Sequence, residues 1–100
     1  MAEVLLTLVV PASIAQHVED FLLEQTEEVA GFTSSQVAGY GKSVSLTAAA
    51  EMVGGSAPRI RIQMIGSEAA MRDLLAKIKR EWPHARIYCW LQSVIEAGYL

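Results

Sequence analysis

The sequence predicts an α+β fold, in which a four-stranded antiparallel sheet carries two helices on one face. Four segments are alternately or continuously apolar, which is typical of strands. Two further segments place apolar residues at helical spacing and separate these strands. The resulting order is strand, helix, strand, strand, helix, strand. With two crossovers, this is the split βαβ arrangement, whose helices both cover the same face of the sheet.

The first strand and helix occupy residues 4–26. Residues 4–10 are apolar on both alternating faces except at Thr7, a pattern that predicts a central strand covered on both sides. Ser13 and Gln16 have the spacing of a capping box, so we expect the helix to begin there. Gly31 is expected to supply a left-handed turn beyond the helix end. The buried helical stripe is predicted to contain Ile14, Val18, Phe21 and Leu22.

The second half supplies two strands and the second helix. Residues 32–40 are polar and glycine-containing, which predicts a strand near an edge of the sheet. Residues 59–64 alternate strictly and should place their isoleucines against the helices. Ser67 is expected to cap the second helix, and Pro83 follows its end. The buried stripe of that helix is predicted to contain Met71, Leu74, Leu75, Ile78 and Trp82.

The last strand, residues 86–92, is unusual because both of its faces favour burial. Ile87, Cys89 and Leu91 should face the helices, where the cysteine would act as a small buried hydrophobe. Tyr88 and Trp90 would then lie on the face that the helices leave open. Burial of such a ring is worth about 4–5 kcal/mol, so exposure of both rings would be costly.

Self-association follows as an expectation from this open face. Residues 93–100 stay apolar to the last position, whereas unattached termini are normally polar. We therefore predict an interface between identical subunits. A monomer whose tail folds back over its own sheet is the alternative. The predicted interface residues are Tyr88, Trp90, Tyr99 and Leu100.

The overall composition excludes several classes of protein. A net charge of -3 argues against a nucleic-acid-binding protein, which would normally carry a basic face. A single cysteine forbids an internal disulfide and is typical of a reducing compartment. We see no export signal, and the longest apolar run is too short to span a membrane. These features predict one cytoplasmic domain.

No set of residues has the pattern of a catalytic site, so we expect neither an enzyme nor a cofactor. His17 and Asp20 could provide two metal ligands from one helix face, but structural zinc needs four, and a solvated face is the favoured interpretation. His84 lies in a turn beside Pro83. It could touch a ligand at a subunit junction, although a plain surface turn is favoured.

Arg59 and Arg61 share one face of their strand and need carboxylate partners or a bound anion if that face is covered. Two interpretations remain open. The arginines pair with Glu51 or Glu96 of a neighbouring subunit, or they form a site for an anion or nucleotide. Nearby glycines would let a phosphate approach the backbone, but they match no phosphate-binding fingerprint, and turn flexibility is preferred: Gly39, Gly41, Gly54 and Gly55.

Several short runs stand out along the whole chain. They are residues 5–11, 21–23, 31–34 and 39–41, the loop run 51–54, and Trp90, Leu91, Val94, Gly98 and Leu100 near the end. Together they resemble a small bacterial family of unassigned function that is grouped with PII-like signalling proteins. The resemblance covers essentially the whole chain, and its C-terminal pattern is the most specific part.

The resemblance implies a ferredoxin-like homotrimer similar to PII and CutA proteins, with residues 41–58 as a mobile T-loop. It also implies a role in metal resistance, because genes of this family often accompany heavy-metal efflux pumps of the RND type. The protein would then regulate a membrane transporter, with Glu51, Gly54 and Gly55 contacting that partner. A small anionic or nucleotide ligand would bind near Gly39, Tyr40, Lys42, Arg59, Arg61 and His84.

Two other functions are compatible with the same fold. A CutA-like protein that binds divalent metal ions is the alternative. A small ferredoxin-like monooxygenase ranks last, because the predicted core contains no polar residue placed for catalysis. The turn at residues 82–85 lacks the glycines with which PII proteins hold the phosphates of ATP.

Overall fold

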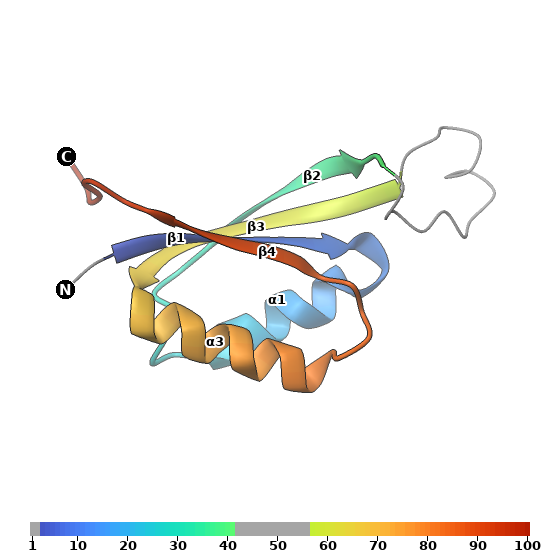
Figure 1. Ribbon diagram of the computed structural model, residues 1–100, viewed down its shortest axis with the longest axis horizontal. Coiled ribbons are helices and arrows are strands. Elements are labelled where there is room, and N and C mark those ends of the chain that lie inside the picture. Colours follow the sequence, from blue (N-terminus) through green and yellow to red (C-terminus); the bar gives the residue numbers. More distant parts are fainter. Residues whose placement is uncertain (1–2, 42–56) are drawn as a thin grey trace.

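The computed structural model describes residues 3–41 and 57–100. Within these ranges a single sheet forms one layer and two α-helices form the other (Figure 1). Its strands are antiparallel and lie in the order β2-β3-β1-β4. Both helices lie on the same face, so the predicted fold class is confirmed. The elements are β1 (Glu3–Pro11), a 3-10 helix η1 (Ala12–Ile14), α1 (Ala15–Glu24), β2 (Thr33–Gly39), β3 (Ala57–Ser67), α3 (Glu68–Glu81) and β4 (Tyr88–Ser93).

The core lies between the sheet and the two helices. Leu6 and Leu8 of β1 have no exposed surface, because β1 is flanked by β3 and β4 and covered by the helices. Each such side chain contributes about 1.5–3 kcal/mol through burial. The predicted central strand and both helical stripes are confirmed. The buried helical residues are Ala15, Val18 and Leu22 of α1 and Met71, Leu74 and Ile78 of α3.

The two helices begin differently, and the capping box predicted for α1 is wrong. The Ser67 hydroxyl accepts a hydrogen bond from the Ala70 amide at 3.1 Å, so the predicted cap of α3 is confirmed. By contrast, α1 follows Ile14, which makes no side-chain cap bond. Ser13 lies inside η1 and not in the extended conformation that an N-cap residue requires. The Gln16 side chain donates to Asp20 instead, at 2.9 Å.

The chain leaves α1 without a left-handed glycine, so the role predicted for Gly31 is also wrong. The Gln25 amide donates to the Leu22 carbonyl at 3.0 Å, a tight 3-10 closure that ends the helix. The ammonium of Lys77, on α3, then contacts the Glu28 carboxylate at 2.6 Å and the Gln25 side chain at 3.3 Å. These bonds fasten the turn, so no left-handed residue is needed there.

Strand β4 begins later than predicted and leaves its cysteine exposed. Arg86 has a φ of 58°, outside the range of a strand, so pairing starts at Tyr88. Ile87 and Leu91 pack against the core as expected. Cys89 faces the same side but is exposed, which corrects the prediction that it is buried. Because β4 is an edge strand, its short side chain does not reach the helix layer.

The predicted T-loop, residues 41–58, falls mainly outside the described residues, and with it Lys42, Glu51, Gly54 and Gly55. Its last two residues, Ala57 and Pro58, belong to β3, which therefore begins earlier than expected. In residues 3–41 and 57–100, no helix combines the length and apolar character needed to cross a membrane.

Candidate functional site

Within residues 3–41 and 57–100, no second layer covers the sheet face opposite the helices, here called the open face (Figure 1). Strand register places its residues in rows. One row joins Gln63, Thr7 and Trp90, and the next joins Arg61, Val9 and Tyr88. Because Gln63 and Trp90 flank it, Thr7 is completely buried although no helix covers it. The Gln63 side chain donates a hydrogen bond to the Thr7 hydroxyl at 3.2 Å.

The side of the open face formed by β4 is rich in exposed aromatic surface. The Tyr88 side chain is 69% exposed and that of Trp90 is 38% exposed, and their ring centroids lie 5.9 Å apart. Beyond β4, the apolar tail residues Ile95, Tyr99 and Leu100 are fully exposed. The predicted exposure of these side chains within one chain is therefore confirmed. The interface that they would form stays a prediction.

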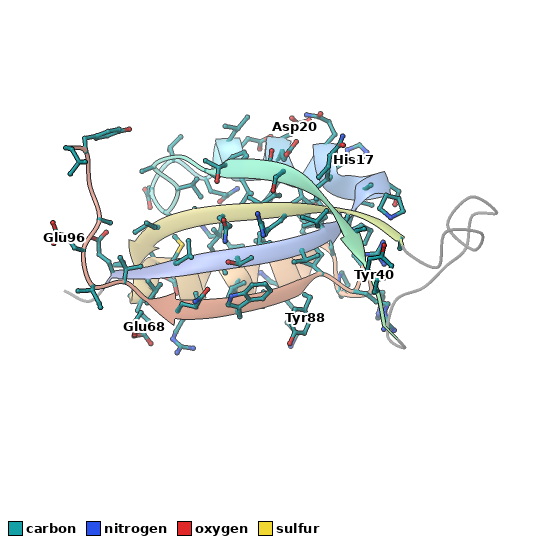
Figure 2. The ribbon with its side chains drawn as sticks, turned by 90° about the horizontal axis from the view of Figure 1, so that it is seen from above. His17, Asp20, Tyr40, Glu68, Tyr88 and Glu96 are labelled. Carbon is teal, nitrogen blue, oxygen red and sulfur yellow. The ribbon has the colours of Figure 1, made fainter. Side chains whose placement is uncertain are left out.

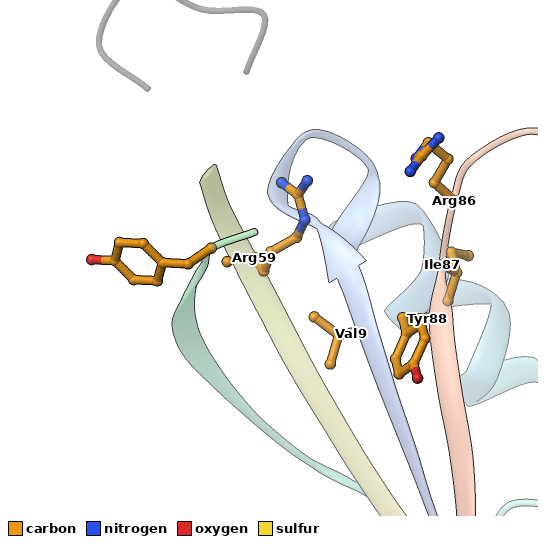
Figure 3. A pocket seen from close by; sticks show the side chains of 7 residues that line it. Val9, Arg59, Arg86, Ile87 and Tyr88 are labelled. Carbon is orange, nitrogen blue, oxygen red and sulfur yellow. The ribbon is translucent and has the colours of Figure 1, made fainter. Parts of the chain in front are cut away.

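A pocket of about 590 Å³ lies at one end of the sheet, where β2 ends and β3 and β4 begin. We call it the sheet-end pocket. In an antiparallel sheet, the end of one strand lies beside the start of its neighbour, so residues distant in sequence meet there. Figure 3 shows the guanidinium groups of Arg59 and Arg86 at one end, with Val9 and Tyr88 below them. The lining residues are Val9, Gly39, Tyr40, Arg59, Arg86, Ile87 and Tyr88.

Only part of the predicted ligand site is assembled in this pocket. Gly39, Tyr40 and Arg59 line it, and their role in binding a ligand stays a prediction. Arg61 lies two residues further along the same face of β3 and does not line it. His84 is exposed in the turn after α3 and also lies outside the lining.

Sequence reasoning missed Val9, Arg86 and Ile87 and gave Tyr88 an interface role alone. The predicted strand order already places the end of residues 4–10 beside the starts of the third and fourth strands. That signal could have found Val9. Arg86 has no such signal, because it was expected inside a strand. Its left-handed φ turns the chain at the pocket edge, an uncommon conformation for a residue other than glycine.

The pocket combines two cations with apolar and aromatic walls. Arg59 is half-buried, and its Nη1 donates to the Pro58 carbonyl at 3.0 Å, which holds the side chain near the backbone. Among the described residues that line the pocket, none is a carboxylate. The predicted pairing with Glu96 of a neighbour stays a prediction. Figure 2 places Glu96 and Tyr40 at opposite ends of the molecule, so Glu96 of the same chain does not reach the pocket.

The two predicted metal ligands on α1 lie away from this pocket. His17 and Asp20 are neighbours on the outer side of α1 (Figure 2). Among residues 3–41 and 57–100, no group of three or more His, Cys, Asp or Glu side chains could hold a metal ion. The pair therefore gains no third ligand from the described part of the chain.

The whole sequence, residues 1–100, matches the family model described as "Protein of unknown function (DUF3240)". The chain belongs to the DUF3240 family. Comparison of this DUF3240 chain with curated proteins finds no match. Membership confirms the resemblance to a PII-like family of unassigned function.

Solved structures show which fold this DUF3240 chain shares. A DUF3240 family protein from Shewanella baltica OS155 is 20% identical, with a TM-score of 0.80 over 100% of this chain and 98% of that one. CPII, a nitrogen regulatory PII-like protein from Thiomonas intermedia K12, is 15% identical, with a TM-score of 0.71 over 100% and 98%. CutA1 from Pyrococcus horikoshii OT3 is 14% identical, with a TM-score of 0.71 over 95% and 86%. These likenesses establish the ferredoxin-like fold of PII and CutA proteins.

Proposed function

We propose that this DUF3240 protein is a non-enzymatic, cytoplasmic, PII-like regulatory protein that forms a homotrimer through the open face and binds a small anion in the sheet-end pocket. One observation supports it most. Tyr88 is both the largely exposed ring of the open face and a wall of the cationic pocket. A neighbouring subunit that covers Tyr88 would also enclose the pocket, so a ligand held there would stabilise the assembly by mass action.

The chemistry of the pocket supports binding over catalysis. Its lining residues offer two guanidinium groups, two phenols and apolar side chains. The described part of the lining provides no carboxylate, imidazole or thiol that could act as a general base or nucleophile. Guanidinium groups with aromatic walls suit a planar or compact anion, because they combine bidentate hydrogen bonds with stacking.

The proposed partner is a membrane transporter, and it derives from the family resemblance and not from the described residues. We assign its contacts to Glu51, Gly54 and Gly55 on sequence grounds. In this proposal, ligand binding at the sheet end changes the contact with the transporter.

Calorimetric titration with ADP, AMP and bicarbonate tests ligand binding, since CPII is described as bound to these three molecules. We expect at least one of them to bind. Arg59→Gln should weaken that binding about tenfold, as expected for loss of a charge-assisted hydrogen bond. Arg61→Gln, on the same strand face but outside the pocket, is the matched control and should change affinity less than about twofold. Absence of binding at millimolar concentration, or equal losses in both variants, would contradict the proposal.

The alternative function is CutA-like binding of a divalent metal ion. It is supported by the shared fold and by the adjacent His17 and Asp20 on α1. The same calorimeter separates the two functions. Tight, stoichiometric uptake of copper or zinc that is lost in His17→Ala, without binding of any anion, would favour the metal-binding function.

A further inference from the structure

A second pocket, of about 300 Å³, opens on the other side of the sheet, between the end of α3 and the start of β4. We call it the helix-side pocket. Strand alternation directs Cys89 toward the helices and Tyr88 and Trp90 away from them. The two pockets share Arg86 and Ile87 at the start of β4. The function proposed above does not use it. Its apolar lining residues are Leu8, Leu75, Ile78, Trp82, Pro83 and Ile87.

The packing of α3 explains why this pocket is present. The buried residues of α3 lie against the central strands, and the edge strand β4 receives less cover. Cys89, at the edge of the pocket, is consequently exposed. The opposite wall is fixed, since the Trp82 ring packs edge-to-face on Phe21 with a centroid distance of 5.3 Å. The pocket is thus pre-formed on its helix side.

Positively charged residues accompany the apolar walls of this pocket. Among the described residues of the lining, the charged ones are Lys79 and Arg86. Lys79 is exposed in the last turn of α3. Apolar walls with a few convergent polar groups are typical of small-molecule sites, and cations beside them select a negatively charged ligand.

We propose that the helix-side pocket binds a compact apolar carboxylate, such as an aromatic or short-chain acid. The hydrocarbon part would lie among Leu75, Trp82 and Ile87, and the carboxylate would accept a hydrogen bond from Lys79. The size agrees, because an apolar cavity of about 150 Å³ already holds a benzene ring. The remaining volume accommodates the carboxylate.

The single cysteine of the chain provides a direct test, because Cys89 lines this pocket and not the sheet-end pocket. The second-order rate constant for alkylation of Cys89 by iodoacetamide is measured on the whole protein at increasing benzoate concentrations. Benzamide, which has the ring without the charge, and acetate, which has the charge without the ring, serve as controls. We expect benzoate to slow alkylation severalfold with a saturable dependence. Neither benzamide nor acetate should do so at the same concentration.

Lys79→Gln and Arg80→Gln make a matched pair, since Arg80 is the next residue on α3 but lies outside this pocket. Lys79→Gln should raise the half-saturating benzoate concentration about tenfold, and Arg80→Gln should leave it unchanged. Unchanged alkylation in benzoate, equal protection by benzamide, or equal effects of both variants would overturn the proposal. So would a rate that falls with protein concentration in the absence of benzoate, because a second copy would then be covering Cys89.

Discussion

Thr7 is the one fully buried polar side chain among the described residues, and its hydroxyl is satisfied by Gln63 across the strand pair. Cross-strand pairs of this kind fix the register of a sheet, because a slip would leave the hydroxyl and the amide unpaired. From the sequence, Thr7 was an interruption in an apolar strand. Its hydrogen-bond partner depends on the register of β1 against β3, which no local pattern reveals.

Thr7→Val should reduce the free energy of unfolding by about 1–2 kcal/mol, since the half-buried Gln63 amide then loses its acceptor. Adding Gln63→Leu should recover much of this loss, because both polar groups are then replaced. Urea denaturation measures the free energies of all four members of this cycle. A Thr7→Val protein as stable as the wild type would show that the hydrogen bond does not contribute.

The residues of the sheet-end pocket show what sequence can reveal at this scale. Arg59 was predicted because two arginines on one strand face demand an anionic partner. Gly39 is a candidate because a glycine would let a phosphate approach the backbone, and Tyr40 is a candidate through the family resemblance. Arg86 was missed because its role depends on a left-handed φ of 58°, a backbone conformation that sequence pattern does not indicate for arginine.

At the level of elements, the helix starts show where local signals succeed and fail. Ser67 and Ser13 both precede an apolar helical stripe, but only Ser67 has the extended conformation of an N-cap residue. Pro11 and η1 carry the chain into α1, so Ser13 is already in a helical turn. Spacing alone does not distinguish the two serines, because the difference lies in the backbone before each helix.

Ser67→Ala should therefore lower the free energy of unfolding by about 1 kcal/mol, because it removes the acceptor for the Ala70 amide. Ser13→Ala is the matched control and should change it by less than about 0.5 kcal/mol, since Ser13 caps nothing. Thermal or urea unfolding of both variants makes the comparison. A larger loss for Ser13→Ala than for Ser67→Ala would contradict this assignment of the helix starts.

In strand β4, the sequence predicts the direction of the side chains but not the burial of each one. Alternation correctly sorted Tyr88 and Trp90 from Ile87 and Leu91, because side-chain direction in a strand follows sequence position. It did not give the burial of Cys89, which depends on how far α3 extends over an edge strand. The direction of a side chain in a strand is a local property, whereas its burial depends on how the helices pack against that strand.

For the whole molecule, the fold followed from the sequence because the order of elements leaves few allowed connections. The central position of β1 was visible in its two apolar faces, and the edge position of β2 in its polarity. Contacts between subunits determine what covers the open face. The sequence of one subunit predicts that this face is buried, but it does not predict how the subunits are arranged.

The open face is the central claim at this scale, and a double substitution there addresses it. Tyr88→Glu with Trp90→Glu would place charges on the proposed interface and should dissociate the assembly, because unpaired charges are costly to bury. Leu23→Glu is the control. Leu23 is 66% exposed on α1, on the helix side of the molecule, and its substitution should leave the assembly intact.

Sedimentation equilibrium at micromolar protein is the most direct measurement. The chain has a mass of 10.9 kDa, and the account predicts about three times that value for the wild type and the Leu23→Glu variant, with the single-chain mass for the double variant. A wild-type protein that sediments at the mass of one chain across this range would contradict it.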